Sequence, residues 1–144
     1  MKTFTEKIRK LVYAKKYFIR RHHIENERIY REIQAADVEI ALKNGQFNRI
    51  RQETNNVFWR GQDVDGRQLE LMLTLLEDDG EETLVIEDAK QVKVETAYEP
   101  GKDDKELLME WLKNHSNYEE AKNGKGVRRK VEVITKRTKV RRKE

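Results

Sequence analysis

The sequence predicts an α+β fold: N-terminal helices packed on a four-stranded antiparallel sheet, followed by a short helix and a basic C-terminal tail. Three observations lead to this prediction. Apolar residues recur at helical spacing near the N-terminus, and apolar and polar residues then alternate between residues 57 and 98. After residue 121, lysines and arginines dominate the sequence.

The first helix is expected over residues 4–21, where apolar side chains form one face and lysines and arginines fill the rest. It either continues to Tyr30 or breaks near residues 18–19, where aromatic and β-branched side chains cluster. A second helix is expected over residues 35–43, because Gly45 follows its apolar stripe and glycine commonly ends a helix.

Strand-like alternation is clearest at residues 67–76, where leucines at every second position predict one buried face. The dipeptide Asp65-Gly66 just before it is a strong tight-turn signal. Consecutive strands joined by such short turns must pair antiparallel. The four expected strands are residues 57–62, 67–76, 83–87 and 92–98, with a further short strand as an option at 47–50 and a last amphipathic helix at 103–114.

The chain of 144 residues suits one domain, which we place at residues 1–118, followed by a linker and basic extension at 119–144. It contains no cysteine, which excludes disulfides and thiolate metal sites and favours a reducing compartment. No apolar run approaches the roughly 20 residues that span a bilayer. The basic N-terminus also lacks the apolar core of a signal peptide. We therefore expect a cytoplasmic protein without a membrane partner.

Charge is strongly segregated along the chain. Residues 122–144 contain eleven Lys and Arg and two Glu, a net charge of +9, whereas the whole chain carries +4, so residues 1–121 carry −5. A basic run of this kind is typical of a segment that binds nucleic acid or another polyanion, and the alternative is a solubilising tail. The candidate nucleic-acid-binding residues of the tail are Arg128, Arg129, Lys130, Lys136, Arg137, Lys139, Arg141 and Arg142.

Motifs that would hold a cofactor or a metal ion are missing from the sequence. There is no phosphate-cradling glycine loop, and the three histidines lack the ligand spacing of a zinc site. We therefore expect no cofactor and no metal site. Metal-free cleavage of RNA remains open, because the 2′-hydroxyl is the nucleophile and the protein needs only a base, an acid and cations.

The best constellation for such chemistry is His23, Glu27 and Arg31, which share one face if the segment is helical. A carboxylate at this spacing raises the pKa of a histidine, and an arginine adds a fork for phosphate. The alternative is a solvated helix face with ordinary ion pairs.

The predicted strands add further candidates. Trp59 is expected in the core, which places Arg60 on the opposite face of the strand. Thr96 and Tyr98 are expected to share one face of the last strand. Tyr98 either stacks a base or donates to phosphate, or else closes the sheet edge. Arg67, just after the tight turn, is expected to be exposed.

Three segments resemble the small domain-of-unknown-function family 4258, which is often grouped with RelE- and BrnT-like toxins. REIQAADVEIALKNG at residues 31–45 is similar to its R-x-I-x-x-x-D-V-x-x-A-L-x-x-G segment. RG and DGRQL, at residues 60–61 and 65–69, resemble its G-x-x-x-x-G-x-x-L hairpin, and VETAYEP at 94–100 resembles its closing V-x-T-A-Y-x-P.

The resemblance covers about residues 19–100, and it implies two helices on an antiparallel sheet of the type shared by small metal-free ribonucleases. It also implies a toxin role with an antitoxin as partner. Members commonly carry a histidine at the helix start, which His23 matches. The usual arginine four residues later is Glu27 here, and Arg28 follows it.

The first hypothesis is therefore an RNA-binding protein of the RelE-like toxin type, with RNA or the ribosome as partner. If the protein is catalytic, this hypothesis makes it a metal-free endoribonuclease. His23 would be the acid or base, and Arg28, Arg31 and Arg60 would stabilise phosphate. Thr96 and Tyr98 would position the substrate. The second hypothesis is a non-catalytic binding module for nucleic acid or ribonucleoprotein, and the third is a protein-interaction domain whose tail contacts an acidic partner.

Overall fold

A computed structural model describes residues 3–115 of the chain, and these residues form two compact units. The sheet unit comprises residues 3–20 and 34–100, and the helical unit comprises residues 21–33 and 101–115. No helix among the described residues is long and apolar enough to cross a bilayer. The expected domain boundary at residue 118 and the whole basic tail lie outside the described residues.

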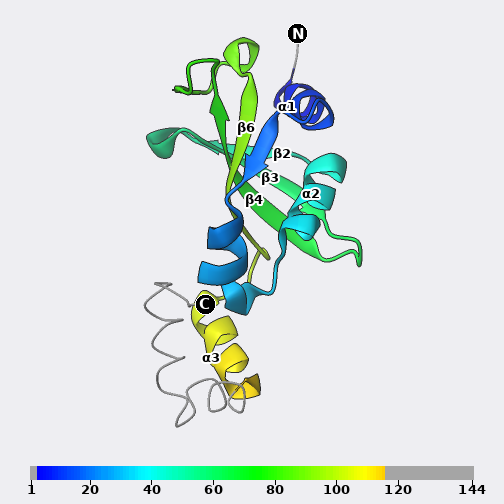
Figure 1. The fold of residues 1–144 in the computed structure, drawn as a ribbon, viewed down its shortest axis with the longest axis vertical. Helices are drawn as coiled ribbons and strands as arrows, with labels where there is room; N and C mark the ends of the chain where they lie inside the picture. Colours follow the sequence, from blue (N-terminus) through cyan, green and yellow to red (C-terminus); the bar gives the residue numbers. More distant parts are fainter. Residues whose placement is uncertain (1–2, 116–144) are drawn as a thin grey trace. The chain divides into compact units, whose positions relative to one another are not determined.

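The sheet unit contains a six-stranded mixed sheet in place of the four antiparallel strands expected from the sequence (Figure 1). Its main path runs through β1 (Tyr17–Ile19), β6 (Gln91–Tyr98), β4 (Gln68–Leu76), β3 (Asn56–Gln62) and β2 (Gln46–Arg51), and β5 (Glu82–Thr83) pairs with β4. β1 is parallel to β6, and the other pairs are antiparallel. The α+β class is confirmed, while the number of strands and the purely antiparallel pairing are corrected.

The extra parallel strand arises because the first helix is shorter than expected. α1 (Phe4–Tyr13) is followed by Lys15 in the left-handed conformation, with φ 62°. The aromatic and β-branched side chains of Tyr17–Ile19 then favour extended backbone, and this segment pairs with residues 92–94. The expectation of one helix over residues 4–21 is therefore wrong, and the alternative break in the helix occurs a few residues earlier than residues 18–19.

The strand expected at residues 83–87 is also shorter in the structure. β5 ends at Thr83, and Ile86–Asp88 form a single 3₁₀ turn. The hydroxyl of Thr83 accepts a hydrogen bond from the N–H of Val85 at 2.9 Å. Such a local side-chain contact competes with strand pairing and bends the chain.

The main core lies between the sheet and its two helices, α1 and α2 (Ala35–Asn44), which lie on the same side of the strands (Figure 1). All four alternate leucines of β4, Leu69, Leu71, Leu73 and Leu75, are fully buried. The predicted alternation is thus confirmed, and burying each leucine contributes about 2 kcal/mol. The N–H of Gln34 donates to the Asp37 carboxylate at 2.8 Å and so closes the first turn of α2.

α2 approaches β3 so closely that two glycines are needed at the contact. A Cβ atom on Gly61 would collide with the backbone of Ala41, and one on Gly45 would collide with the carbonyl of Arg60. Trp59 fills the neighbouring space, where its Nε1–H donates to the Ala41 carbonyl at 3.1 Å. The placement of Trp59 in the core is confirmed, and Arg60 points to the opposite face of the sheet.

The helical unit has a small core of its own. It contains a π-helical turn η1 (His23–Glu27), a 3₁₀ turn η2 (Ile29–Arg31) and the helix α3 (Asp104–Asn114). The buried side chains of Tyr30 and Trp111 form the core, and Ile29, Leu107, Leu108 and Leu112 pack against them. The first helix does not continue to Tyr30, which was one of the two expected outcomes, because it ends at Tyr13 and β1 follows it. Within the helical unit, Arg28 has a non-helical conformation, with φ −113° and ψ 39°, and separates η1 from η2.

Candidate nucleic-acid interface

The face of the sheet opposite α1 and α2 is largely polar, and we call it the open face. Residues paired across neighbouring strands share a face, so the register defines its members. The side chains that it carries include Phe18, Arg20, Asn48, Arg49, Arg51, Asn56, Phe58, Arg60, Glu70, Met72, Thr74, Lys93, Glu95, Thr96 and Tyr98. Basic side chains outnumber carboxylates among them, which makes the face attractive to an anion.

Two arginines cover an aromatic ring at the β2 end of the open face. The Arg49 Cζ lies 3.9 Å from the centroid of the Phe58 ring, and the Arg51 Cζ lies 5.5 Å from it. Phe58 is only 2% exposed, although it lies on the polar face of the sheet. Within residues 3–115, neither arginine forms an ion pair with a carboxylate. Two adjacent positive charges are therefore uncompensated within the described part of the chain.

A β-bulge in β2 sets the orientation of the Arg49 and Asn48 side chains. The register passes from Phe47 opposite Trp59 to Arg49 opposite Phe58, so Asn48 is the extra residue. The bulge places Arg49 directly over Phe58. It also turns the amide of Asn48 toward β4, where it donates to a carboxylate oxygen of Glu70 at 2.8 Å.

Arg60, Glu70 and Tyr98 occupy consecutive positions in one row across β3, β4 and β6. The Nε–H of Arg60 donates to Glu70 Oε2 at 3.4 Å, and half of the arginine side chain, 49%, stays exposed. Glu70 is 3% exposed, and among the described residues nothing donates to its second oxygen, Oε1. The row thus combines a buried carboxylate, a half-exposed guanidinium and a phenol.

A second carboxylate, Glu95, organises the β6 side of the open face. It accepts a hydrogen bond from the Thr74 hydroxyl at 2.7 Å and forms ion pairs with Lys93 and Arg20, each at 3.4 Å. Burial acts to raise the pKa of Glu95, but the Thr74 hydrogen bond and the two cations outweigh it and hold the pKa below its ordinary value. Lys93 and Arg20 therefore have a carboxylate counterion, whereas Arg49 and Arg51 have none among residues 3–115.

The helical unit holds the other candidate acid–base group. His23 Nδ1 lies 2.8 Å from Glu27 Oε1, and His22 Nε2 lies 3.9 Å from Glu27 Oε2. Burial acts to raise the pKa of Glu27, but the hydrogen bond from His23 and the charges of both histidines and Arg28 bring it below its ordinary value. An imidazole paired with a carboxylate in this way can serve as an acid or a base.

Arg31 does not join His23 and Glu27 on one helical face, because the π turn and the 3₁₀ turn interrupt the regular helix between them. Its guanidinium instead pairs in bidentate fashion with Asp104, at 2.9 Å and 2.6 Å. The hydrogen bond from Arg31 is the main cause that lowers the pKa of Asp104. With only 11% of its side chain exposed, Arg31 links η2 to α3, which is a structural role.

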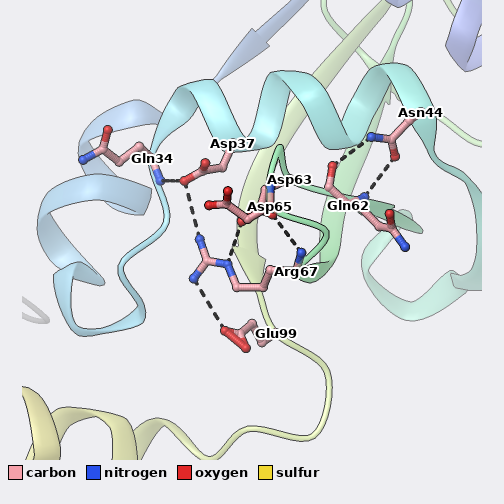
Figure 2. Close-up of polar contacts among 8 residues, drawn as sticks. All are labelled: Gln34, Asp37, Asn44, Gln62, Asp63, Asp65, Arg67 and Glu99. Carbon is pink, nitrogen blue, oxygen red and sulfur yellow. Dashed lines mark hydrogen bonds and ion pairs between the residues drawn. The ribbon is translucent and has the colours of Figure 1, made fainter.

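Arg67 was expected to be exposed, but it lies among three carboxylates (Figure 2). It contacts Asp63 at 2.9 Å and both Asp37 and Glu99 at 3.5 Å. Asp63 also accepts the backbone N–H groups of Asp65 and Arg67, and these bonds outweigh burial and lower its pKa. The cluster ties the β3–β4 hairpin to α2 and to the end of β6.

The described residues offer no group of three or more His, Cys, Asp or Glu arranged to hold a metal ion. Thr96 and Tyr98 share a face as predicted, and Thr96 pairs with Met72. The eight candidate residues of the tail, from Arg128 to Arg142, lie outside the described residues.

Sequence reasoning missed Arg49, Arg51, Phe58 and Glu70. The available signal for a shared face was the spacing of Arg49, in the optional short strand at residues 47–50, and Arg51, directly after that strand. Nothing local in the sequence signalled the bulge that brings Arg49 over Phe58. Comparison of the chain with protein-family models, curated proteins and solved structures gives no match.

Proposed function

We propose that this chain is an RNA-binding protein and that the open face of its sheet is the RNA-binding surface. The observation that carries the proposal is the pair Arg49 and Arg51, which cover Phe58 and have no carboxylate partner within residues 3–115. Like charges held side by side repel each other, and a phosphate backbone supplies the missing counterions. Arg60 and Tyr98 extend the same surface across the sheet.

The basic tail supports the same proposal from the sequence. Its net charge of +9 suits a tether that keeps the chain near a polyanion, while the open face makes the closer contacts. The resemblance to family 4258 extends the proposal to a RelE-like toxin, whose protein partner would be an antitoxin.

In a catalytic form of this proposal, the row of Arg60, Glu70 and Tyr98 cleaves the bound RNA. A base takes the proton of the RNA 2′-hydroxyl, whose oxygen then bonds to phosphorus while the bond from phosphorus to the 5′-oxygen breaks. The leaving oxygen receives a proton from an acid, and the products are a 2′,3′-cyclic phosphate and a 5′-hydroxyl end. Glu70 is the base in this form, Tyr98 the acid, and Arg60 stabilises the charge on phosphate.

Two other arrangements compete with this catalytic form. The pair of His23 and Glu27 in the helical unit is an independent acid–base candidate. A non-catalytic binding module is favoured by the burial of Glu70, which is 3% exposed and already holds hydrogen bonds from Asn48 and Arg60.

Binding is tested with the full chain and a short fluorescent RNA, followed by anisotropy. Replacing both arginines, Arg49→Ala with Arg51→Ala, should weaken binding about tenfold or more, because two phosphate contacts are lost. The matched control is Lys10→Ala with Lys43→Ala, which removes the same charge from the exposed sides of α1 and α2. Equal affinity of the two double variants would remove the open face from the proposal.

Cleavage is tested by incubating the full chain with RNA and mapping the new ends. Glu70→Gln should slow cleavage about a hundredfold or more if Glu70 is the base, and Glu53→Gln, an exposed glutamate, is the control. Loss of activity in His23→Ala alone would assign the chemistry to the helical unit. Binding without any cleavage by the wild-type chain would select the non-catalytic module.

A further inference from the structure

We propose that the guanidinium of Arg49, stacked on Phe58, is a platform for one unpaired base, so that the bound RNA is single-stranded. This inference rests on the proposed function and specifies the substrate class of the same surface. It starts from the two features that set Arg49 apart: its position over the ring and its lack of a carboxylate partner within residues 3–115.

The distance between the groups defines how Arg49 lies. If an N–H pointed into the ring, the Cζ would be farther away by about the length of a C–N bond, so 3.9 Å indicates a guanidinium parallel to the Phe58 ring. The inner face of the guanidinium is then covered by Phe58. Its outer face remains available, since the Arg49 side chain is exposed.

A flat guanidinium face binds a base by stacking, which a compact ammonium group does not do. The aromatic ring beneath it fixes the orientation, so little rotamer entropy is lost when a base arrives. Phe58 itself is 2% exposed and cannot be reached by a base. Bases in a duplex have both faces covered by their neighbours, so a stacked complex requires an unpaired base.

Arg51 has a different part in the same site. Its Cζ lies 5.5 Å from the ring centroid, beyond close stacking distance, and its charge is also without a carboxylate partner in the described part of the chain. It is therefore placed to contact the phosphate that follows the stacked base. The bulge at Asn48 keeps both arginines on the open face in this order.

The test compares Arg49→Lys with Arg51→Lys in the full chain, because both variants keep the charge and lose the planar group. Each is titrated with a single-stranded RNA, with the same RNA lacking its central bases, and with a duplex of equal length. Wild type should prefer the intact single strand to both other RNAs by about tenfold. Arg49→Lys should lose this preference, and Arg51→Lys should keep most of it.

Several outcomes decide the inference. If wild type binds intact and base-free RNA equally, or if Arg49→Lys keeps the wild-type preference, the platform is overturned while RNA binding itself stands. If no RNA binds at all, the proposed function fails instead. Should Arg49→Lys fail to fold, the wild-type comparison of intact with base-free RNA decides alone, and Phe58→Leu serves as the second variant, with partial loss of preference expected.

Discussion

At the scale of single residues, the counterion of each arginine indicates its role. Arg31 and Arg67 are held by carboxylates and join segments of their own unit. Arg49 and Arg51 have no such partner among the described residues, and Arg49 lies directly against an aromatic ring. A fixed, neutralised arginine stabilises the fold, whereas an exposed and uncompensated one is available to a ligand.

This distinction predicts that two substitutions differ in their effect on stability. Arg31→Ala should lower the free energy of unfolding by roughly 1–3 kcal/mol, because charge-assisted hydrogen bonds to Asp104 are lost. Arg49→Ala should change it by less than about 1 kcal/mol, since only a cation–π contact is removed. Urea denaturation of both variants measures the difference, and a larger loss in Arg49→Ala would contradict the assignment.

The lowered pKa of Asp104 predicts a pH dependence. The hydrogen bond from Arg31 holds this pKa below the ordinary value of 3.8, so the stabilisation is fully present above 3.8 and is lost as pH falls below it through the lower pKa of the folded state. The destabilisation caused by Asp104→Asn should therefore shrink when unfolding is measured near pH 3 instead of pH 7. Asp88→Asn, an exposed site, is the control and should show no such trend.

At the scale of elements, close contacts between helix and sheet set the geometry of the open face. Gly45 and Gly61 allow α2 to lie against β3. Trp59 packs beside this contact and donates a hydrogen bond to the Ala41 carbonyl. With the odd-numbered residues of β3 fixed on this side, Phe58 and Arg60 must face the other way. The core thus determines which side chains the open face presents.

Gly61→Ala tests this contact. The new methyl group would collide with the backbone of Ala41, which cannot move without shifting α2, so we expect a loss of roughly 1–3 kcal/mol in unfolding free energy. Gly80→Asn is the comparison variant, because open space surrounds this turn position and any cost there comes from its positive φ and not from a collision. Equal stability of Gly61→Ala and wild type would show that α2 packs less closely.

The contact between β1 and α2 predicts an unusual tyrosine. The Tyr17 hydroxyl donates to Glu39 at 2.7 Å, and burial together with this carboxylate raises the pKa of Tyr17 to about 12. The stabilisation is present below pH 10 and is lost as pH rises toward 12, because the folded state keeps the proton longer. In an ultraviolet titration, Tyr17→Phe should remove a tyrosine that ionises near pH 12.

At the scale of the whole molecule, local signals in the sequence predicted the local structure well. The leucine alternation of β4 and the helix at α2 follow from the spacing of apolar residues, and the burial of Trp59 follows from its large aromatic side chain. The structure confirms all three. Each depends on a single element and its nearest neighbours in sequence. Their prediction needs no knowledge of distant pairing.

Features that depend on distant pairing could not be predicted. The parallel pairing of β1 with β6 joins residues more than seventy positions apart, for example Tyr17 with Val92, and has no local signature. The bulge at Asn48 and the pairing of Arg31 with Asp104 are likewise set by tertiary contacts. Such tertiary contacts add Arg49, Arg51, Phe58 and Glu70 to the predicted sheet residues Arg60, Thr96 and Tyr98 on the open face.

The salt dependence of RNA binding follows from the charges of the whole chain. Each phosphate contact to a single strand contributes roughly 0.7 to the slope of log affinity against log salt. Arg49→Ala with Arg51→Ala should therefore reduce the slope by about 1.4. Replacing Arg128, Arg129 and Lys130 of the tail by Gln tests the tether in the same assay, and an unchanged slope would exclude it.

The most direct test of the RNA-binding open face is an NMR titration of the isotope-labelled full chain with a short single-stranded RNA. We expect the largest shifts in the backbone and guanidinium signals of Arg49, Arg51 and Arg60, with Phe58 also shifted and the exposed side of α2 unchanged. Binding that leaves these open-face signals in place and shifts only residues 122–144 would contradict the account.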